Sequence, residues 1–73
     1  MTPRLPVVSG AKTLGALRKA GFSQVGQRGS HAKLRHADGR TVIVPLHQEL
    51  ARGTLRSILR QADLSQEEFR ELL

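Results

Sequence analysis

The hydrophobic residues that follow the first prolines recur at helical spacing. Leu14 and Leu17 fall on one face of a helix that we expect over residues 10–20. Ser9 stands where its side chain caps the first turn, and Gly21 follows as the left-handed residue that ends many helices. The pattern therefore predicts a helix that packs one face on a core.

Patterns of period two then predict three strands. Residues 22–28 form a modest candidate that Gly29 ends, and Ser30–His36 and Arg40–Leu46 are stronger candidates. The loop between these last two is Ala-Asp-Gly, residues 37–39. A three-residue loop with glycine last favours a type I turn followed by a left-handed bulge residue.

The register of this hairpin decides which side chains face the core. The bulged turn sets Leu34 opposite Val42 and Ala32 opposite Val44. A two-residue Asp-Gly turn slips the pairing by one position and sets Lys33 opposite Val44, which buries a lysine. We therefore expect the bulged turn.

The C-terminal third predicts two helices after a loop over residues 47–53. The first begins near Thr54, where either Gly53 eases the entry and Thr54 caps, or the first amides after Arg52 receive an anion. Its apolar residues fall at i, i+3, i+4 and i+7; they are Leu55, Ile58, Leu59 and Ala62. A short helix follows from Ser65, with Glu68 completing a capping box. Phe69, Leu72 and Leu73 form its apolar edge.

The order of elements predicts an α+β fold: a helix, three antiparallel strands, a helix and a short helix. We expect residues 1–73 to form a single domain, in which residues 1–8, with two prolines and no period, are an extended lead-in. The chain has no cysteine and no apolar run of about 18 residues, so we expect no disulfide, no transmembrane helix and a cytoplasmic location.

Charge is distributed unevenly along the chain. Residues 1–61 hold eleven Lys and Arg against two acids, a net charge of +9. Residues 62–73 hold one Arg against four acids, a net charge of −3. A strongly basic body favours a polyanionic partner, because each phosphate that it neutralises releases counterions.

The second strand carries the candidate chemistry. If Ala32 faces the core, then His31, Lys33 and Arg35 all point to the opposite side of the sheet. An imidazole there can exchange protons near neutral pH, and RNA supplies its own nucleophile, the 2′-hydroxyl. Either His31 is a surface residue that ends a strand, or it acts on a phosphodiester that the cations hold.

The other histidines have separate interpretations. His47 lies diagonal to His31 at roughly 7–8 Å between backbones, and it is either a second proton-transfer group or a loop residue. His36 faces away from His31 and is interpreted as structural. With no cysteine and with only Asp38 and Glu49 nearby, a metal site lacks ligands, so we expect no metal and no other cofactor.

Taken together, these segments resemble the HicA toxins, small mRNA interferases of type II toxin–antitoxin systems. The matching residues, in chain order, are Gly21-Phe22, Arg28-Gly29-Ser30-His31, Asp38-Gly39-Arg40, Val42-Ile43-Val44-Pro45, His47, Gly53-Thr54-Leu55-Arg56-Ser57-Ile58-Leu59-Arg60-Gln61-Ala62, Leu64-Ser65 and Glu67-Glu68-Phe69. The resemblance extends over residues 9–73.

The resemblance implies a fold similar to the double-stranded-RNA-binding domain and metal-independent endoribonuclease activity on mRNA. It implies that His31 is catalytic, and that a HicB-type antitoxin covers the active surface. His47 is a possible assistant. The residues that we expect to contact RNA are Arg28, Gly29, Ser30, Lys33 and Arg35.

Two other functions remain as alternatives. A double-stranded-RNA-binding module without catalysis would use the same basic face and would need no histidine. A helix-turn-helix DNA-binding module over residues 54–73 would bring Glu67, Glu68 and Glu71 to the major groove, where they repel phosphate.

Overall fold

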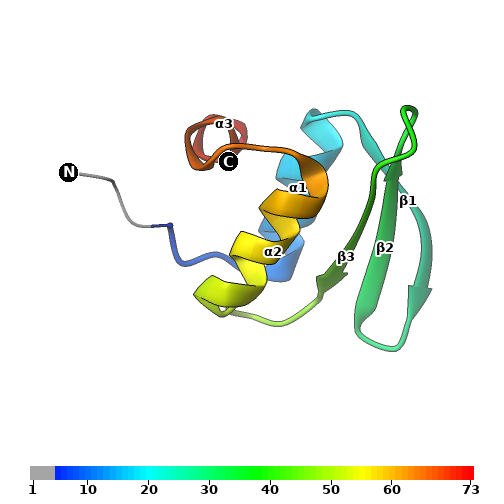
Figure 1. The fold of residues 1–73 in the computed structure, drawn as a ribbon. Helices are drawn as coiled ribbons and strands as arrows, with labels where there is room; N and C mark the ends of the chain where they lie inside the picture. Colours follow the sequence, from blue (N-terminus) through cyan, green and yellow to red (C-terminus); the bar gives the residue numbers. More distant parts are fainter. Residues whose placement is uncertain (1–4) are drawn as a thin grey trace.

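The computed structural model describes residues 5–73. The elements are α1 (Gly10–Lys19), β1 (Phe22–Arg28), β2 (His31–His36), β3 (Thr41–Pro45), α2 (Arg52–Ala62) and α3 (Gln66–Leu72). The strands form one antiparallel sheet in the order β1-β2-β3, and α1 and α2 lie on the same side of it (Figure 1). The predicted α+β fold is confirmed, and it is like that of the double-stranded-RNA-binding domain with a short third helix.

The predicted cap of α1 is confirmed. The Ser9 hydroxyl accepts the Lys12 N–H at 3.0 Å. Gly21 follows the helix with a φ of +100°, and a Cβ there would lie 2.8 Å from the His36 ring. Glycine therefore serves both the left-handed backbone and the close approach to His36.

The second hairpin has the predicted bulged turn. The Gly39 N–H donates to the His36 carbonyl and the His36 N–H donates to the Arg40 carbonyl, each at 2.9 Å. Gly39 has a φ of +99°. Leu34 consequently pairs with Val42, as expected. The apolar residues of β2 and β3 that we expected in the core therefore face the helices.

Strand β1 contains a β-bulge that we did not predict. Gln24 pairs with Leu34, but the register shifts before Gly26, which pairs with Lys33. Beyond the shift, Arg28 pairs with His31 across a two-residue turn. The two-residue turn therefore sets Arg28 directly beside His31, and the bulge changes the register only for the first half of β1.

Helix α2 begins at Arg52, two residues before the predicted start, and Thr54 is not its cap. Ala51 is the N-cap residue, and it makes no side-chain hydrogen bond. The buried Leu50 donates its N–H to the Val8 carbonyl at 2.8 Å, so the chain is held just before the helix begins. Tertiary contact, and not a capping side chain, decides where α2 starts.

Helix α3 has the predicted capping box. The Ser65 hydroxyl accepts the Glu68 N–H and a Glu68 carboxylate oxygen accepts the Ser65 N–H, each at 3.0 Å. These bonds, the backbone one foremost, hold the pKa of Glu68 below its usual range. Of the expected apolar edge, Phe69 is buried, Leu72 is half-buried and Leu73 is exposed.

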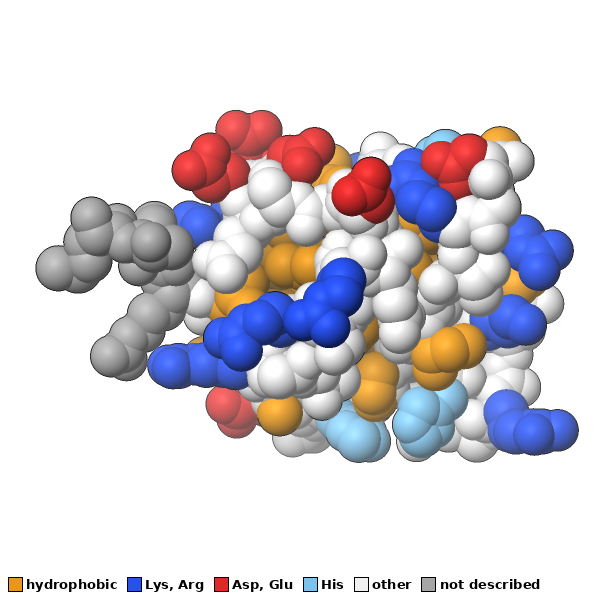
Figure 2. Space-filling model, viewed as in Figure 1, with side chains coloured by type: hydrophobic (Ala, Val, Ile, Leu, Met, Phe, Trp, Pro, Cys, Tyr) orange, Lys and Arg blue, Asp and Glu red, His pale blue; other side chains and the backbone are white. Residues whose placement is uncertain are grey.

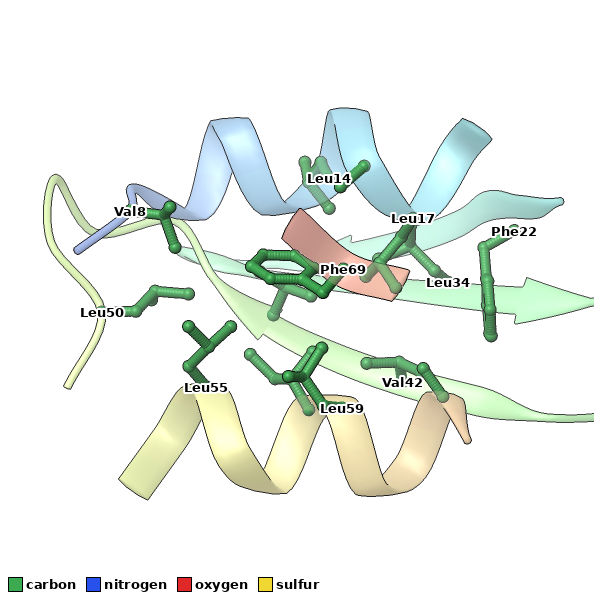
Figure 3. Close-up of a cluster of buried hydrophobic side chains, with 14 of the residues drawn as sticks. Val8, Leu14, Leu17, Phe22, Leu34, Val42, Leu50, Leu55, Leu59 and Phe69 are labelled. Carbon is green, nitrogen blue, oxygen red and sulfur yellow. The ribbon is translucent and has the colours of Figure 1, made fainter. Parts of the chain in front are cut away.

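The core lies between the helices and one face of the sheet, with Phe69 near its centre (Figure 3). Leu5 and Val8 are buried in it, so the lead-in that we expected to be merely extended contributes to the core. Residues 1–4 of that lead-in lie outside the described residues. Within residues 5–73, no helix has both the length and the apolar character needed to span a bilayer.

Candidate functional site

The outer face of β2 carries the predicted basic residues. His31, Lys33 and Arg35 are exposed, whereas Ala32 and Leu34 between them are fully buried. In Figure 1 no labelled helix lies against this face of the sheet. The predicted orientation of the strand is confirmed, so the imidazole of His31 projects from a cationic and accessible surface.

His31 lies in a shallow hollow of about 390 Å³ on this face, which we call the His31 hollow. Cross-strand pairing brings Arg28 beside His31 and Ile43 beside Lys33. The residues that line the hollow are Gly26, Gln27, Arg28, His31, Lys33 and Ile43. Two cations and one imidazole therefore border a space that opens to solvent.

Gly26 opens this hollow, and the sequence analysis missed it. A Cβ at Gly26 would meet no atom within 4 Å, so the glycine leaves open space opposite Lys33. Glycine inside a strand is a known signal of a β-bulge. That signal was present in residues 22–28 and would have found both the bulge and the hollow.

The structure separates the other predicted contact residues from the hollow. Arg35 is on the same face but four strand positions from His31, or about 13 Å. Gly29 and Ser30 form the β1–β2 turn, and the Ser30 carbonyl accepts the Leu46 N–H at 2.6 Å. The turn therefore extends the β2–β3 pairing to the residue before the start of β2.

His47 lies beside His31, as the register predicts. The two ring centroids are 6.4 Å apart and the ring planes meet at 71°. The His47 carbonyl accepts the Gly10 N–H at 2.9 Å. A Cβ at Gly10 would collide with the Pro45 carbonyl and come within 2.9 Å of the Leu46 Cα. The start of α1 is thus packed tightly against the end of β3, and this contact holds the backbone of His47 in place.

His36 lies at the other end of the second hairpin. Its Nδ1 accepts the Asp38 N–H at 3.2 Å, and its ring meets the Phe22 ring edge-on at 5.2 Å. These contacts support the interpretation that His36 is structural. They also separate it from the pair formed by His31 and His47.

Arg40 belongs to the same structural cluster as His36. Its guanidinium lies 2.8 Å from an Asp38 carboxylate oxygen and 5.1 Å from the Phe22 ring centroid, and it donates to the Ala62 carbonyl. The Arg40 backbone N–H, its guanidinium and the nearby His36 hold the pKa of Asp38 below its usual range. Arg40 is therefore engaged in tying the β2–β3 turn to α2.

Most of the acidic side chains lie at one end of the molecule. Figure 2 shows histidine side chains next to each other at one end, and most of the acidic side chains at the opposite end. The acids there include Asp63, Glu68 and Glu71, which follow α2 or lie on α3. The lining of the His31 hollow holds two cations and no carboxylate, so an anion that enters it meets positive charge.

The described residues offer few side chains that could bind a metal ion together. Among residues 5–73, no group of three or more His, Asp or Glu side chains lies close enough together to hold one. The expectation of metal-independent chemistry stays a prediction.

Comparison with known proteins assigns the chain to a family. A family model described as the HicA toxin of bacterial toxin–antitoxin systems matches residues 10–64. The chain belongs to the HicA family. It is therefore the toxin of a toxin–antitoxin system, and it pairs with an antitoxin. The matched residues of this HicA toxin include the whole His31 hollow and His47 but leave out α3. No curated protein matches the sequence significantly.

Proposed function

We propose that this HicA toxin is an endoribonuclease that cleaves mRNA without a bound metal ion and uses His31 to transfer a proton. The observation that carries the proposal is the position of His31. Its imidazole is exposed between Arg28 and Lys33, and the His47 ring is 6.4 Å away. Two imidazoles beside two cations are what a phosphodiester cleavage that depends on proton transfer requires.

The chemistry follows from the structure of RNA. The 2′-oxygen bonds to phosphorus and the bond from phosphorus to the 5′-oxygen breaks, which leaves a 2′,3′-cyclic phosphate and a 5′-hydroxyl. One imidazole accepts the proton of the 2′-hydroxyl, and a protonated imidazole donates a proton to the leaving oxygen. His31 performs one of these transfers, and His47 is the nearest group for the other.

The cations that line the hollow bind the phosphate and stabilise its charge. Arg28 is paired directly with His31 across the strands, and Lys33 is two positions further along the same face. A guanidinium binds two phosphate oxygens at once, and both cations stabilise the charge that builds on phosphorus during the reaction. Arg35 extends the basic face toward the next phosphate of the RNA. Gly29 and Ser30 contact the RNA through the backbone of the turn.

Regulation of this activity depends on the partner. We infer that a HicB-type antitoxin covers the His31 hollow, and that growth stops when the toxin is free to degrade mRNA in the cytoplasm. The hollow lies on the sheet face that carries His31 and Lys33, so a protein that lies across this face would exclude RNA from it.

One second candidate rests on the fold. A double-stranded-RNA-binding module that lacks catalysis would use the same cationic face. Such a module leaves RNA intact, and it would have no use for an exposed histidine between Arg28 and Lys33.

Incubation of labelled RNA with the purified chain separates the two functions. We expect the parent to cleave the RNA and the His31→Ala variant to leave it intact, with a free energy of unfolding within about 1 kcal/mol of the parent, as for exposed sites in general. His36→Gln is the matched control, because it removes a histidine outside the hollow. Cleavage by His31→Ala at the parental rate would exclude His31, and intact RNA with every variant would favour the binding module.

A further inference from the structure

The solvent face of α2 carries three arginines that the proposed active site does not use. Arg52, Arg56 and Arg60 recur every four residues and are all exposed, and we call them the α2 arginine stripe. Figure 2 shows blue side chains in a line across the part of the surface where Figure 1 has α2. Successive members are about 6 Å apart along the helix axis.

This arrangement does not stabilise the helix. Like charges four residues apart destabilise a helix by about 0.2–0.5 kcal/mol for each pair. Arg52 also lies in the first turn, where the helix dipole disfavours a cation, and that turn holds no acid. The N-cap Ala51 offers no side-chain bond in compensation. Arg60 lies in the last turn, where the helix dipole favours a cation, so the like-charge spacing and the position of Arg52 are what oppose the helix.

No partner for the stripe is found within the described chain. Among residues 5–73, Arg52, Arg56 and Arg60 make no ion pair and no side-chain hydrogen bond, whereas Arg40 makes both with Asp38. Arginines that repel one another along one helix face and have no partner among these residues indicate an anionic ligand from outside.

The stripe is connected to the proposed active site through β3. Helix α2 packs against β3, and the Gln61 side chain accepts the Ile43 N–H at 3.4 Å. Ile43 lines the His31 hollow, and Arg52 follows His47 by five residues. In Figure 1, the start of α2 and the β1–β2 turn lie toward the same end of the molecule.

The chemistry of this face favours phosphate over protein. The exposed residues beside the arginines are Ala51, Gly53, Ser57 and Gln61, and none is a large apolar residue. The large exposed hydrophobic residues of the described chain lie elsewhere; they are Val7, Val25, Ile43 and Leu73. Protein interfaces centre on buried Trp, Tyr and Arg anchors, and this face has arginine but no aromatic side chain, whereas a guanidinium alone fits phosphate oxygens bidentately.

We propose that the α2 arginine stripe binds the backbone phosphates of the RNA strand that extends beyond the His31 hollow. This inference rests on the proposed function only in taking RNA as the ligand. The stripe increases affinity without reading sequence, because it meets phosphates and not bases.

The test measures how RNA affinity depends on salt. The association constant K of the His31→Ala chain for a 20-nucleotide single-stranded RNA is measured at several salt concentrations. The same measurement is made on a chain that also carries Arg56→Gln and Arg60→Gln. Each phosphate contact that is lost reduces the slope of log K against log salt by about 0.7. We expect the double variant to reduce the slope by about 1.4, and to melt no lower than the parent because glutamine is a good helix former.

The matched control is the pair Lys12→Gln and Lys19→Gln, which removes the same charge from exposed positions of α1. We expect this control to leave the slope unchanged. An unchanged slope in the arginine variant, or equal losses in both variants, would overturn the proposal. Loss of antitoxin binding with an unchanged RNA slope would also overturn it and would assign the stripe to the protein partner.

The two proposals fail separately. If the parent does not cleave RNA but the arginine variant loses the slope, the stripe stands and the nuclease assignment fails. If the parent cleaves RNA and the arginine variant keeps the parental slope, the nuclease assignment stands and the proposal for the stripe fails.

Discussion

His31 and His47 face one another although they belong to different segments, with ring centroids 6.4 Å apart. Pairing of His31 with Pro45 brings the end of β3 beside the start of β2. The bond from the Gly10 N–H to the His47 carbonyl then holds the chain in place just beyond β3. Three segments of the chain are therefore needed to bring the two imidazoles together.

The first prediction concerns the division of work between these histidines. If one imidazole accepts a proton and the other donates one, kcat/KM of the parent has a bell-shaped pH profile. His47→Ala removes one limb of that profile and reduces the rate by about 10²–10⁴, which is the usual contribution of a positioned acid or base. The measurement is the pH–rate profile for both chains. A His47→Ala chain that keeps both limbs would show that His47 takes no part in proton transfer.

The second prediction fills the His31 hollow. Gly26→Val adds a side chain where a Cβ meets nothing within 4 Å, and valine suits a strand, so we expect the melting temperature to be unchanged or higher. We expect KM for RNA to rise because the space opposite Lys33 is occupied. Steady-state cleavage kinetics check this. Parental kinetics in the filled variant would show that substrate does not enter the hollow.

The third prediction tests how the position of His47 is maintained. Gly10→Ala places a methyl group against the Pro45 carbonyl, so we expect it to lower the free energy of unfolding by about 1–3 kcal/mol, as overpacking does. Gly15→Ala is the matched control in the same helix. Its methyl group meets no atom within 4 Å, and we expect it to stabilise the chain by about 0.5–1 kcal/mol. Denaturant titration of both variants measures the difference, and equal effects would contradict the close approach at Gly10.

The fourth prediction follows from the depressed pKa of Glu68. Because the folded carboxylate titrates below the unfolded one, the unfolded chain binds more protons between the two values. The stability from this group is therefore complete above the usual glutamate range of roughly 4–5, and it is lost as the pH falls through the folded pKa. Melting temperatures of the parent should decline over that window. Glu68→Gln keeps the capping hydrogen bond but does not titrate, so it should decline less; an identical decline would contradict the assignment.

Much of the fold could be predicted because its signals are local. Ser9 and Ser65 cap their helices as expected, since a hydroxyl at those positions satisfies the nearest free amides. Gly39 fits the bulged turn, and that turn fixed the register that sends Lys33 outward. These elements depend on residues a few positions apart.

The remaining features depend on contacts between distant segments. Helix α2 begins after Ala51, which has no capping side chain, because Leu50 is held by Val8. A bulge between Gln24 and Gly26 shifts the pairing of β1 with the distant half of β2 and leaves Gly26 opposite Lys33 at the hollow. Local spacing does not contain these relationships, although glycine within a strand was a signal of the bulge.

The central claim is that His31 transfers a proton in a cleavage that uses the 2′-hydroxyl of RNA as the nucleophile. The measurement that tests this compares the cleavage of an RNA oligonucleotide with the cleavage of a 2′-deoxy strand of the same sequence. Mass spectrometry identifies the ends of the products. We expect the parent chain to cleave only the RNA and to leave a 2′,3′-cyclic phosphate or its hydrolysis product, and His31→Ala to cleave neither strand. Cleavage of the 2′-deoxy strand at a similar rate would contradict it.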